Sequence, residues 1–227
     1  MFGESFRFSD RSEAGRLLAA KLRHYAGRHP VVLALPRGGV PVALEVARAL
    51  NAPLDLVLVR KIGVPFQPEL AAASVAEGDP PVLIRNEEVL SAFGLDDAFL
   101  KAEQALQLAE IDRRRRAYLG DRPRPTLRGR TAIVVDDGIA TGATTRAALE
   151  SVRRQRPAAV VLAAPVAPPE TVASLRALVD DAVILHAPHD LGSIGFYYRD
   201  FRQLSDEEVV AMLAQAPAAT AQNVPAG

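Results

Sequence analysis

The stretch that decides the fold is Thr131–Thr145, with the sequence TAIVVDDGIATGATT. Four apolar β-forming residues, Ala132 to Val135, lead directly into two carboxylates, Asp136 and Asp137. A loop containing glycine follows, and an amphipathic helix begins after it. In an open α/β sheet, ligands bind at the carboxyl ends of the strands. The order strand, acid pair, loop and helix therefore predicts an α/β fold with its functional site beside the acid pair.

The loop after the acid pair suits a phosphorylated sugar. Glycine lets backbone N–H groups approach a phosphate, and a helix N-terminus adds partial positive charge. The two carboxylates can accept hydrogen bonds from ribose hydroxyls or assist a bound Mg²⁺. Helix capping would be the better explanation of an isolated Asp-Asp pair, but not of the whole string with Thr141-Gly142 at its fixed place. The glycine pattern is neither a Walker loop nor a dinucleotide fingerprint.

Composition limits the class of protein. The chain has 227 residues, of which 49% are hydrophobic and 24% charged, as is ordinary for one globular α/β domain. Its 27 basic and 27 acidic residues cancel, so nothing attracts the whole chain to nucleic acid or to an anionic membrane. The absence of cysteine excludes disulfides and thiolate catalysis. The first residues carry acids and lack an apolar signal core, so we expect a cytoplasmic protein without a membrane partner.

Strand and helix patterns alternate along the chain, and the first strand–helix–strand unit predicts parallel strands with a right-handed crossover. One hydrophobic core and a single domain over residues 1–215 are expected, followed by an Ala/Pro-rich, disordered tail at 216–227. The strands are expected at 31–35, 54–59, 70–75, 82–84, 131–135, 159–164 and 182–186, with a turn at 77–80 that joins the third to the fourth. The helices are expected at 10–26, 41–50, 86–92, 96–119, 143–155, 169–179 and from about 205 to 214.

Two further strand ends carry cations. Pro36-Arg37-Gly38-Gly39 can form an anion-binding loop, although a plain turn shaped by glycine is an equal interpretation. Arg60-Lys61 follows the second strand, where two cations suit a polyphosphate or simply a solvated strand end. The carboxyl ends of parallel strands meet at one edge of the sheet, so we expect both cationic segments beside the acid pair. Arg113–Arg116, by contrast, indicates a solvated helix end rather than a nucleic-acid site.

Aromatic and acidic side chains add candidates for contact with a second substrate. Phe196, Tyr197 and Tyr198 follow the last strand and can stack on a heterocycle, with at least one of the three rings expected to pack in the core. Glu69 and Glu77 flank a predicted strand and are further candidates for substrate contact.

The stretch Val134–Thr144, VVDDGIATGAT, resembles the phosphoribosyl-pyrophosphate signature of the type I phosphoribosyltransferases. The Pro36–Gly39 loop resembles the pyrophosphate loop of that family, and Arg60-Lys61 resembles its basic pair. The resemblance covers about residues 30–186. Three segments, ALPRGGVPVA, LVRKIGVPFQPELA and IGFYYRDFRQLSDEEV, are similar to a bacterial subgroup of these transferases whose acceptor is not established.

The resemblance implies a three-layer α/β/α sandwich. Its mostly parallel six-stranded sheet would have the order 3-2-1-4-5-6, with strand 3 antiparallel. The core would span about 30–186, and a small hood subdomain would come from 1–29 and 188–210. The helices at 86–119 would be an insertion, and the mobile catalytic loop of the family is placed at 62–69.

The implied activity is transfer of 5-phosphoribosyl from phosphoribosyl pyrophosphate to a nitrogenous base, with release of pyrophosphate. This is glycosyltransferase (pentosyltransferase) chemistry of nucleotide salvage, with Mg²⁺ as cofactor held by Asp136 and Asp137. The resemblance assigns catalytic roles to Asp136, Asp137, Arg37 and Lys61. Binding of phosphoribosyl pyrophosphate falls to a larger set, namely Arg37, Gly38, Gly39, Arg60, Lys61, Asp136, Asp137, Gly138, Ile139, Ala140, Thr141, Gly142, Ala143 and Thr144.

The acceptor and the partners stay open at this stage. Ala140 stands where the hypoxanthine–guanine branch carries a carboxylate, so a planar nitrogenous acceptor is expected, with six-oxopurines less favoured than in that branch. A non-catalytic regulator that senses phosphoribosyl pyrophosphate or a nucleotide is the alternative from another class, and an enzyme with a non-base acceptor is a third. The balanced charge disfavours nucleic acid as a partner, and a homodimer is compatible with the resemblance.

Overall fold

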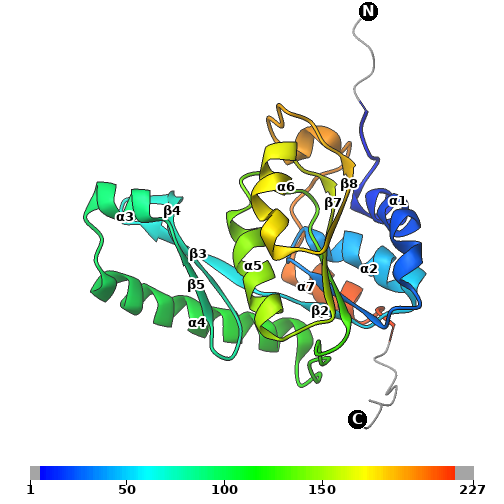
Figure 1. Ribbon diagram of the computed structural model, residues 1–227, viewed down its shortest axis with the longest axis horizontal. Helices are drawn as coiled ribbons and strands as arrows, with labels where there is room; N and C mark the ends of the chain where they lie inside the picture. The colour runs from blue at the N-terminus through cyan, green and yellow to red at the C-terminus, as the bar shows by residue number, and fades with distance from the viewer. Residues whose placement is uncertain (1–5, 218–227) are drawn as a thin grey trace, which may run out of the picture.

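The computed structural model describes residues 6–217, and its centre is a five-stranded parallel sheet with the order β2-β1-β6-β7-β8 (Figure 1). Every neighbouring pair in this sheet is parallel. All five residues of β1 and of β6 are buried, as expected for central strands covered on both faces. The strands are β1 (Pro30–Ala34), β2 (Leu54–Leu56), β6 (Thr131–Val135), β7 (Ala159–Val166) and β8 (Asp181–His186).

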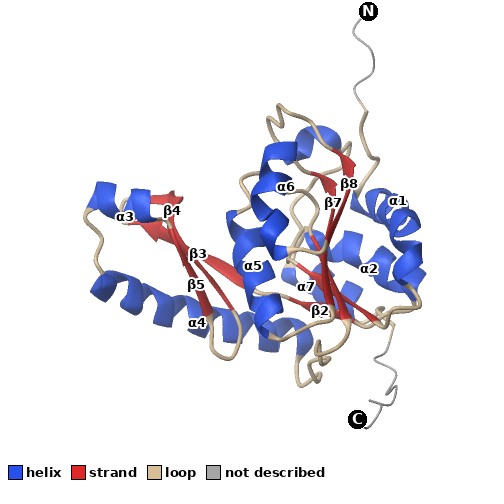
Figure 2. Ribbon diagram, in the orientation of Figure 1, coloured by secondary structure: helices blue, strands red, loops and turns tan. Residues whose placement is uncertain are grey.

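Helices cover both faces of the parallel sheet (Figure 2). On one face lie α1 (Arg11–Leu22), α2 (Gly39–Leu50) and α7 (Asp206–Leu213), which pack with Val32 of β1. On the other face lie α5 (Ala143–Arg154) and α6 (Pro169–Leu175), which pack with Leu33. Because successive side chains of a strand point to opposite faces, these neighbouring residues belong to two separate hydrophobic clusters. Short 3₁₀ turns lie at η1 (Arg23–Tyr25), η2 (Arg176–Leu178) and η3 (Ile194–Tyr197).

A second, antiparallel sheet extends from the body on the side of α5 (Figure 1). It consists of β3 (Val59–Val64), β4 (Gln67–Ala76) and β5 (Val82–Arg85), in that order. Helices α3 (Glu87–Phe93) and α4 (Asp97–Leu119) cover one face of this sheet through a cluster that includes Ile62, Leu90 and Leu100. We call this unit, residues 59–119, the arm.

The α/β class, the parallel sheet and the helices on both of its faces are confirmed, but one detail of the predicted topology is corrected. Residues 70–75 were expected as strand 3, the antiparallel edge strand of the main sheet, and they lie instead in β4 of the arm. The expected strand 54–59 is also divided, because β2 ends at Leu56 and β3 begins at Val59. The reason is local. Short connections let β4 pair with its two sequence neighbours, β3 and β5, and this pairing satisfies the backbone hydrogen bonds of β4 without the main sheet.

The arm, as an additional antiparallel sheet, fits a hood subdomain, whereas the segments assigned to the hood from the sequence are 1–29 and 188–210. The described parts of the segments assigned to the hood also meet, since Phe8 pairs with Tyr198 and its N–H donates to the carbonyl of Tyr197 at 2.8 Å. The predicted helical insertion, 86–119, corresponds to α3 and α4. The predicted disordered tail lies, apart from residues 216 and 217, outside the described residues.

A buried ion cluster joins the arm to the body. Arg115 of α4 donates to both carboxylate oxygens of Asp55 in β2, at 2.9 and 3.0 Å, and to Glu77 at 3.2 Å. Glu77 also accepts from the N–H of Leu58 at 2.9 Å and pairs with Arg124 at 2.8 Å. Burial raises the pKa of Glu77, and Arg115 opposes that rise. The carboxylate of Glu77 therefore braces the arm rather than contacting substrate, and Arg115 is not part of a solvated helix end.

None of the described helices is long and apolar enough to cross a membrane.

Candidate active site

The acid pair lies at the carboxyl end of β6, against the loop that follows β1. A Cβ atom added to Gly38 would lie 2.0 Å from Oδ2 of Asp137. A Cβ atom added to Gly39 would lie 2.8 Å from the carbonyl oxygen of Val135 and 3.4 Å from Oδ1 of Asp136. Only residues without a side chain allow the two segments to approach this closely. The structure therefore brings together the Pro36–Gly39 loop and the acid pair, two segments that the sequence could join only by inference.

The two acids have different surroundings. Asp137 is 8% exposed, and its Oδ2 accepts from Nε of Arg11 in α1 at 2.7 Å. The backbone carbonyl of Asp137 accepts from the hydroxyl of Tyr198 at 2.5 Å. Asp136 is only half-buried, and its Oδ1 accepts from the N–H of Asp137 at 2.9 Å. Within residues 6–217 no cation pairs with Asp136, so Asp136 is the acid that remains available to a ligand.

Burial acts on the ionisation of both acids. Desolvation, and after it the negative charge of Asp137, raises the pKa of Asp136 well above its usual value. Burial also raises the pKa of Asp137, and the neighbouring Arg11 opposes that rise. A carboxylate without its own counter-charge gains most from a cation or from hydroxyl donors that arrive with a ligand. This property distinguishes Asp136 from its neighbour.

Hydrogen bonds to the body hold one side of the loop from Gly138 to Thr144, and its other side faces solvent. The N–H of Ile139 donates to the carbonyl of Val166 at 2.9 Å, and the carbonyl of Ala140 accepts from Thr171 Oγ1 at 2.7 Å. Gly142 has a φ of 77° and caps α5, and a Cβ atom there would lie 2.9 Å from Thr171 Cγ2. The first N–H groups of α5 have no partner within the helix and point out of its N-terminus. The loop is thus preformed for an anion.

Not every residue of this loop can act through its side chain. Ile139 is 2% exposed and packs in the core, so only its backbone is available to a ligand. Gly138 lies under the segment after β8, because a Cβ atom there would lie 2.5 Å from Ile194 Cγ2. Thr141 is exposed, and Thr144 is half-exposed on the first turn of α5. These two hydroxyls are the side-chain donors that the loop offers.

A family model for the phosphoribosyl transferase domain matches residues 11–199, which include both loops and the acid pair. The chain belongs to this family. A Mycobacterium tuberculosis protein that is named, provisionally, a phosphoribosyl transferase is 47% identical over 209 residues, or 92% of this chain and 47% of that protein. The chain thus spans about half the length of the curated relatives it matches. The crystal structure of TT1426 from Thermus thermophilus is 44% identical, with a TM-score of 0.78, and covers 94% of this chain and 100% of that one.

In the phosphoribosyl transferase domain the predicted basic pair lies in the arm rather than at the end of a main-sheet strand. Arg60 and Lys61 lie in β3 of the arm, since the chain leaves the main sheet after Leu56. Nε of Arg60 donates to Oε1 of Gln107 on α4 at 3.0 Å. Lys61 is exposed and, as the next residue of a strand, points to the opposite face of the arm's sheet. The two cations thus leave β3 on opposite faces, yet both line a pocket between the β3–β4 hairpin and α4, and neither acid of the pair is among the residues that line it. The predicted mobile loop, 62–69, is the β3–β4 hairpin.

Arg37 lies nearer to the site of the transferase domain. Its guanidinium is half-exposed and approaches Oδ1 of Asp206, at the start of α7, at 3.7 Å. This long, partly solvated pair is weak and releases the cation at little cost. Arg37 is thus the predicted cation that the structure keeps beside the acid pair.

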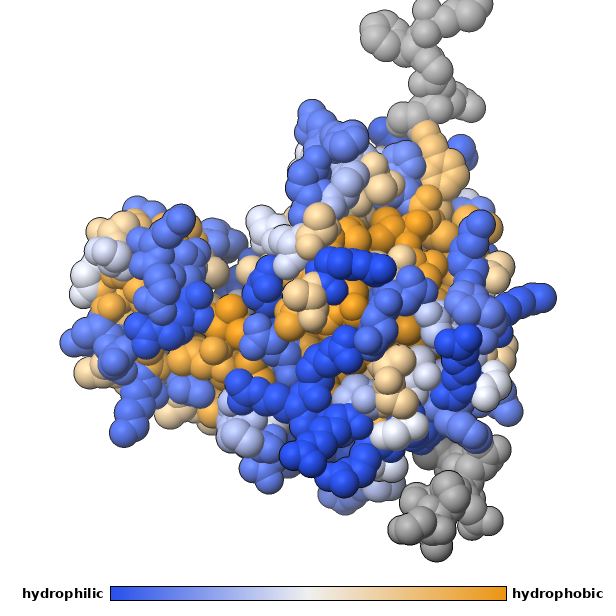
Figure 3. All heavy atoms as spheres, viewed as in Figure 1, coloured by the Kyte–Doolittle hydropathy of each residue, from blue (hydrophilic) through white to orange (hydrophobic). Residues whose placement is uncertain are grey.

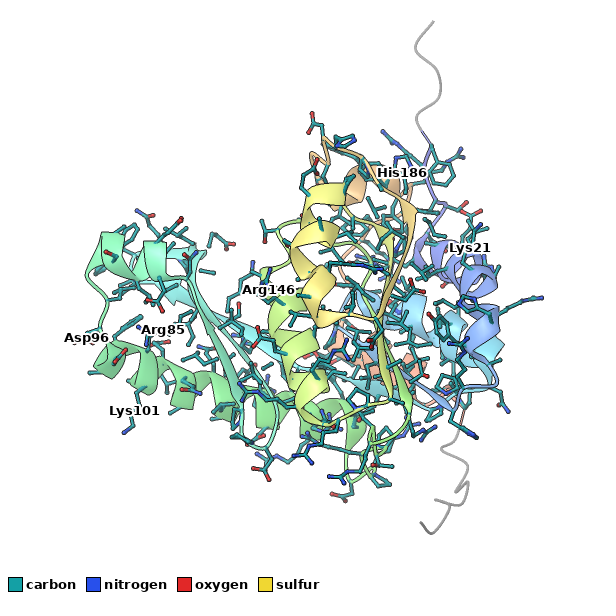
Figure 4. The ribbon with its side chains drawn as sticks, in the orientation of Figure 1. Lys21, Arg85, Asp96, Lys101, Arg146 and His186 are labelled. Atoms are coloured by element: carbon teal, nitrogen blue, oxygen red, sulfur yellow. The ribbon has the colours of Figure 1, made fainter. Side chains whose placement is uncertain are left out.

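A cleft of about 490 Å³ separates the arm from the loop 138–144, and Figure 3 shows the surface hollowed between the arm and the body. Thr141 and Ala143 line its body side, together with Arg146, which Figure 4 shows on α5. The guanidinium of Arg146 donates to the carbonyl of Ser174 at 2.7 Å. Ser74 of β4 and other residues of the arm line the opposite side. The loop 138–144 is therefore open to solvent toward the arm.

The three aromatic residues after β8 have three different environments. Tyr198 is 3% exposed and packs with Phe8, which confirms that at least one ring belongs to the core. Tyr197 lies against His186, with 5.2 Å between the ring centroids, and Figure 4 shows His186 at the end of β8. Phe196 is 64% exposed. Of the three rings, Phe196 is the one that is free to stack on a planar ligand.

Proposed function

We propose that the domain binds phosphoribosyl pyrophosphate along the edge formed by the Pro36–Gly39 loop, the acid pair and the loop 138–144. It then transfers the 5-phosphoribosyl group to a nitrogenous acceptor. The observation that supports this most directly is the contact of Gly38 and Gly39 with the two acids. That contact sets a cationic loop, an available carboxylate and an anion loop side by side. The membership in the phosphoribosyl transferase domain family supports the same reaction.

The proposed reaction breaks the bond between ribose C1 and the pyrophosphate oxygen and forms a bond between C1 and an acceptor nitrogen. The acceptor loses a proton, and pyrophosphate leaves with the electron pair of the broken bond. Asp136 would accept hydrogen bonds from the ribose hydroxyls and stabilise positive charge that develops at the sugar, as in glycoside cleavage. Arg37 would neutralise the leaving group, and the N–H groups at the start of α5 would hold the 5-phosphate. These residues act by positioning and electrostatics.

The residues present fit a Mg²⁺ ion that arrives with the substrate. Residues 6–217 contain no group of three or more His, Cys, Asp or Glu side chains able to hold a metal. Mg²⁺ is usually bound by one or two carboxylates together with substrate phosphates and waters, rather than by a cage of protein ligands. Asp136, half-buried and without a cation of its own, fits that donor set. Bound there, Mg²⁺ would supply charge neutralisation on the diphosphate.

The acceptor we propose is a planar nitrogenous compound other than a six-oxopurine. Ala140 offers no carboxylate beside the anion loop, so no acid of that loop can take a proton from the incoming nitrogen. The exposed ring of Phe196 offers a surface for stacking. Base–aromatic stacking contributes about 1–3 kcal/mol per ring in nucleic-acid complexes, enough to hold a small heterocycle.

Two measurements test the proposal. Calorimetry should detect binding of phosphoribosyl pyrophosphate that weakens when Mg²⁺ is chelated. A screen of heterocyclic acceptors, followed by assay of released pyrophosphate, should then identify a substrate. Absence of binding both to phosphoribosyl pyrophosphate and to ribose 5-phosphate nucleotides would refute the proposed site. Tight binding without pyrophosphate release from any acceptor would favour the regulator instead.

A further inference from the structure

Arg11 makes three contacts around the acid pair. Its Nε donates to Asp137 Oδ2 at 2.7 Å, and its Nη1 donates to the carbonyl of Arg202 at 3.0 Å. The face of its guanidinium lies over the ring of Phe201, with 3.9 Å from Cζ to the ring centroid. The side chain of Arg11 is 11% exposed, and that of Asp137 is 12% exposed. An arginine held on both edges and one face keeps its charge at a fixed place in a region of low dielectric.

Asp137 is enclosed on its other sides as well. Its Oδ2 lies against Gly38, where even a methyl group would not fit, and its carbonyl oxygen is held by Tyr198. The rings of Tyr198 and Phe201 stack with 5.0 Å between their centroids. Phe8 pairs with Tyr198. Arg11 belongs to the chain segment that contains Phe8, and the two rings belong to the segment that contains Tyr198. Asp137, at the end of β6, therefore contacts both of these segments and the Pro36–Gly39 loop.

We propose that Arg11 is a positioning residue for phosphoribosyl pyrophosphate binding, and this inference rests on the proposed function. Arg11 neutralises Asp137 and holds its carboxylate against Gly38. Asp136 would thereby be the acid of the pair left to meet the ribose hydroxyls and to hold a Mg²⁺ ion that neutralises the diphosphate. The sequence treats the two acids as equal, and the pairing with Arg11 separates their roles.

The physical reason is charge balance around a polyanionic ligand. Without Arg11, Asp137 would be an unpaired buried carboxylate beside a second carboxylate and close to the diphosphate. Removing one partner of a buried ion pair is costly because it leaves an uncompensated charge, whereas replacing both partners by neutral groups can be nearly neutral. A role through charge therefore predicts that loss of Asp137 compensates for loss of Arg11. A purely structural contact predicts that the two losses add.

The test is a double-mutant cycle read by calorimetric binding of phosphoribosyl pyrophosphate with Mg²⁺, at a temperature where every variant is folded. Arg11→Gln should weaken binding roughly tenfold, a size typical of coupled pairs. Arg11→Lys should restore part of the affinity, because it restores the charge without the fork of donors. The variant Arg11→Gln/Asp137→Asn should bind more tightly than Arg11→Gln alone. Arg16→Gln is the matched control, since Arg16 is an exposed arginine of the same helix.

The outcomes separate this inference from the proposed function. If the wild-type chain does not bind phosphoribosyl pyrophosphate, the proposed function fails and the role of Arg11 falls with it. If the wild-type chain binds and Arg11→Gln matches Arg16→Gln, only the inference about Arg11 is overturned. If Asp137→Asn abolishes binding and the double variant recovers nothing, Asp137 is itself a ligand of the substrate and the proposed division of roles is overturned.

Discussion

Replacing Gly38 by alanine tests the contact on which the site depends. The new methyl carbon would lie 2.0 Å from Asp137 Oδ2 and 2.5 Å from Asp137 Cγ, both far inside van der Waals contact. The carboxylate cannot simply rotate away, because Arg11 holds it at 2.7 Å. Either the loop after β1 must move or the buried ion pair must open. Both outcomes disturb the edge that we assign to the ligand.

The cost of this substitution follows from known magnitudes. Overpacking a filled site costs about 1–3 kcal/mol, and breaking a buried ion pair costs about 3–5 kcal/mol. Because the loop and the carboxylate can share the displacement, we expect the free energy of unfolding to fall by about 2–4 kcal/mol. For a chain of this size that corresponds to a decrease in Tm on the order of 5–15 °C. Binding of phosphoribosyl pyrophosphate should weaken along with it.

Urea unfolding and calorimetry measure the two effects, and Gly27→Ala is the matched control. Nothing lies within 4 Å of a Cβ atom added to Gly27. The same chemical change there should leave binding intact and shift stability by no more than about 1 kcal/mol, with a small gain from the stiffer unfolded chain. If Gly38→Ala and Gly27→Ala behave alike in both assays, the first loop does not pack on the acid pair and the argument for the site is refuted.

Three other substitutions or titrations test separate parts of the structure. Asp136→Asn should weaken binding of phosphoribosyl pyrophosphate and Mg²⁺ and change the free energy of unfolding by less than about 1 kcal/mol. Asp137→Asn should lower the free energy of unfolding by about 2 kcal/mol or more, because it breaks a buried ion pair. Equal losses of stability in urea unfolding would contradict this difference. Burial raises the pKa of Tyr25 and of Tyr118 to about 12, above the value near 10 of the unfolded chain. The stability that these two tyrosines contribute is therefore present below about pH 10 and should be lost as pH rises toward 12. A phenolate absorbance titration in which all tyrosines of the folded protein ionise near pH 10 would contradict this prediction. Phe196→Leu should raise the KM of an identified acceptor and leave the affinity for phosphoribosyl pyrophosphate unchanged, and a silent substitution would leave the ring without a role in acceptor binding.

The parts of the fold that sequence predicted well are those encoded over short distances. The run of apolar residues before Asp136 is long enough to form a buried strand, and Gly142 is needed because the turn into α5 has positive φ. The same local logic located β1, β7 and β8 and the helices that alternate with them. Parallel order followed because a strand–helix–strand unit of this length has one favoured handedness. Local pattern was therefore sufficient for β1, β6, β7 and β8 and for the positions of both loops of the candidate site.

The arm was predicted less well because its segments carry the same local pattern as strands of the main sheet. The apolar run at 70–75 predicts a strand but not the sheet that it joins. In the structure that strand pairs with its own sequence neighbours, and Arg115, which links Asp55 to Glu77, joins the resulting arm to the body. Once the chain departs after Leu56, Arg60 and Lys61 depart with it. An ion cluster assembled from distant residues has no periodicity by which sequence could reveal it.

The sequence by itself determined the order of strands and helices, the acid pair at the end of β6 and the glycines of the two loops, because each depends on neighbours a few residues away. Only the tertiary structure decided which acid is available. Asp137 and Arg11 are separated by 126 residues, and their ion pair forms only when α1 and the segment after β8 close over the same strand end. In the isolated sequence Asp136 and Asp137 are chemically identical, and the difference between them arises from burial and from the charge that folding places beside one of them.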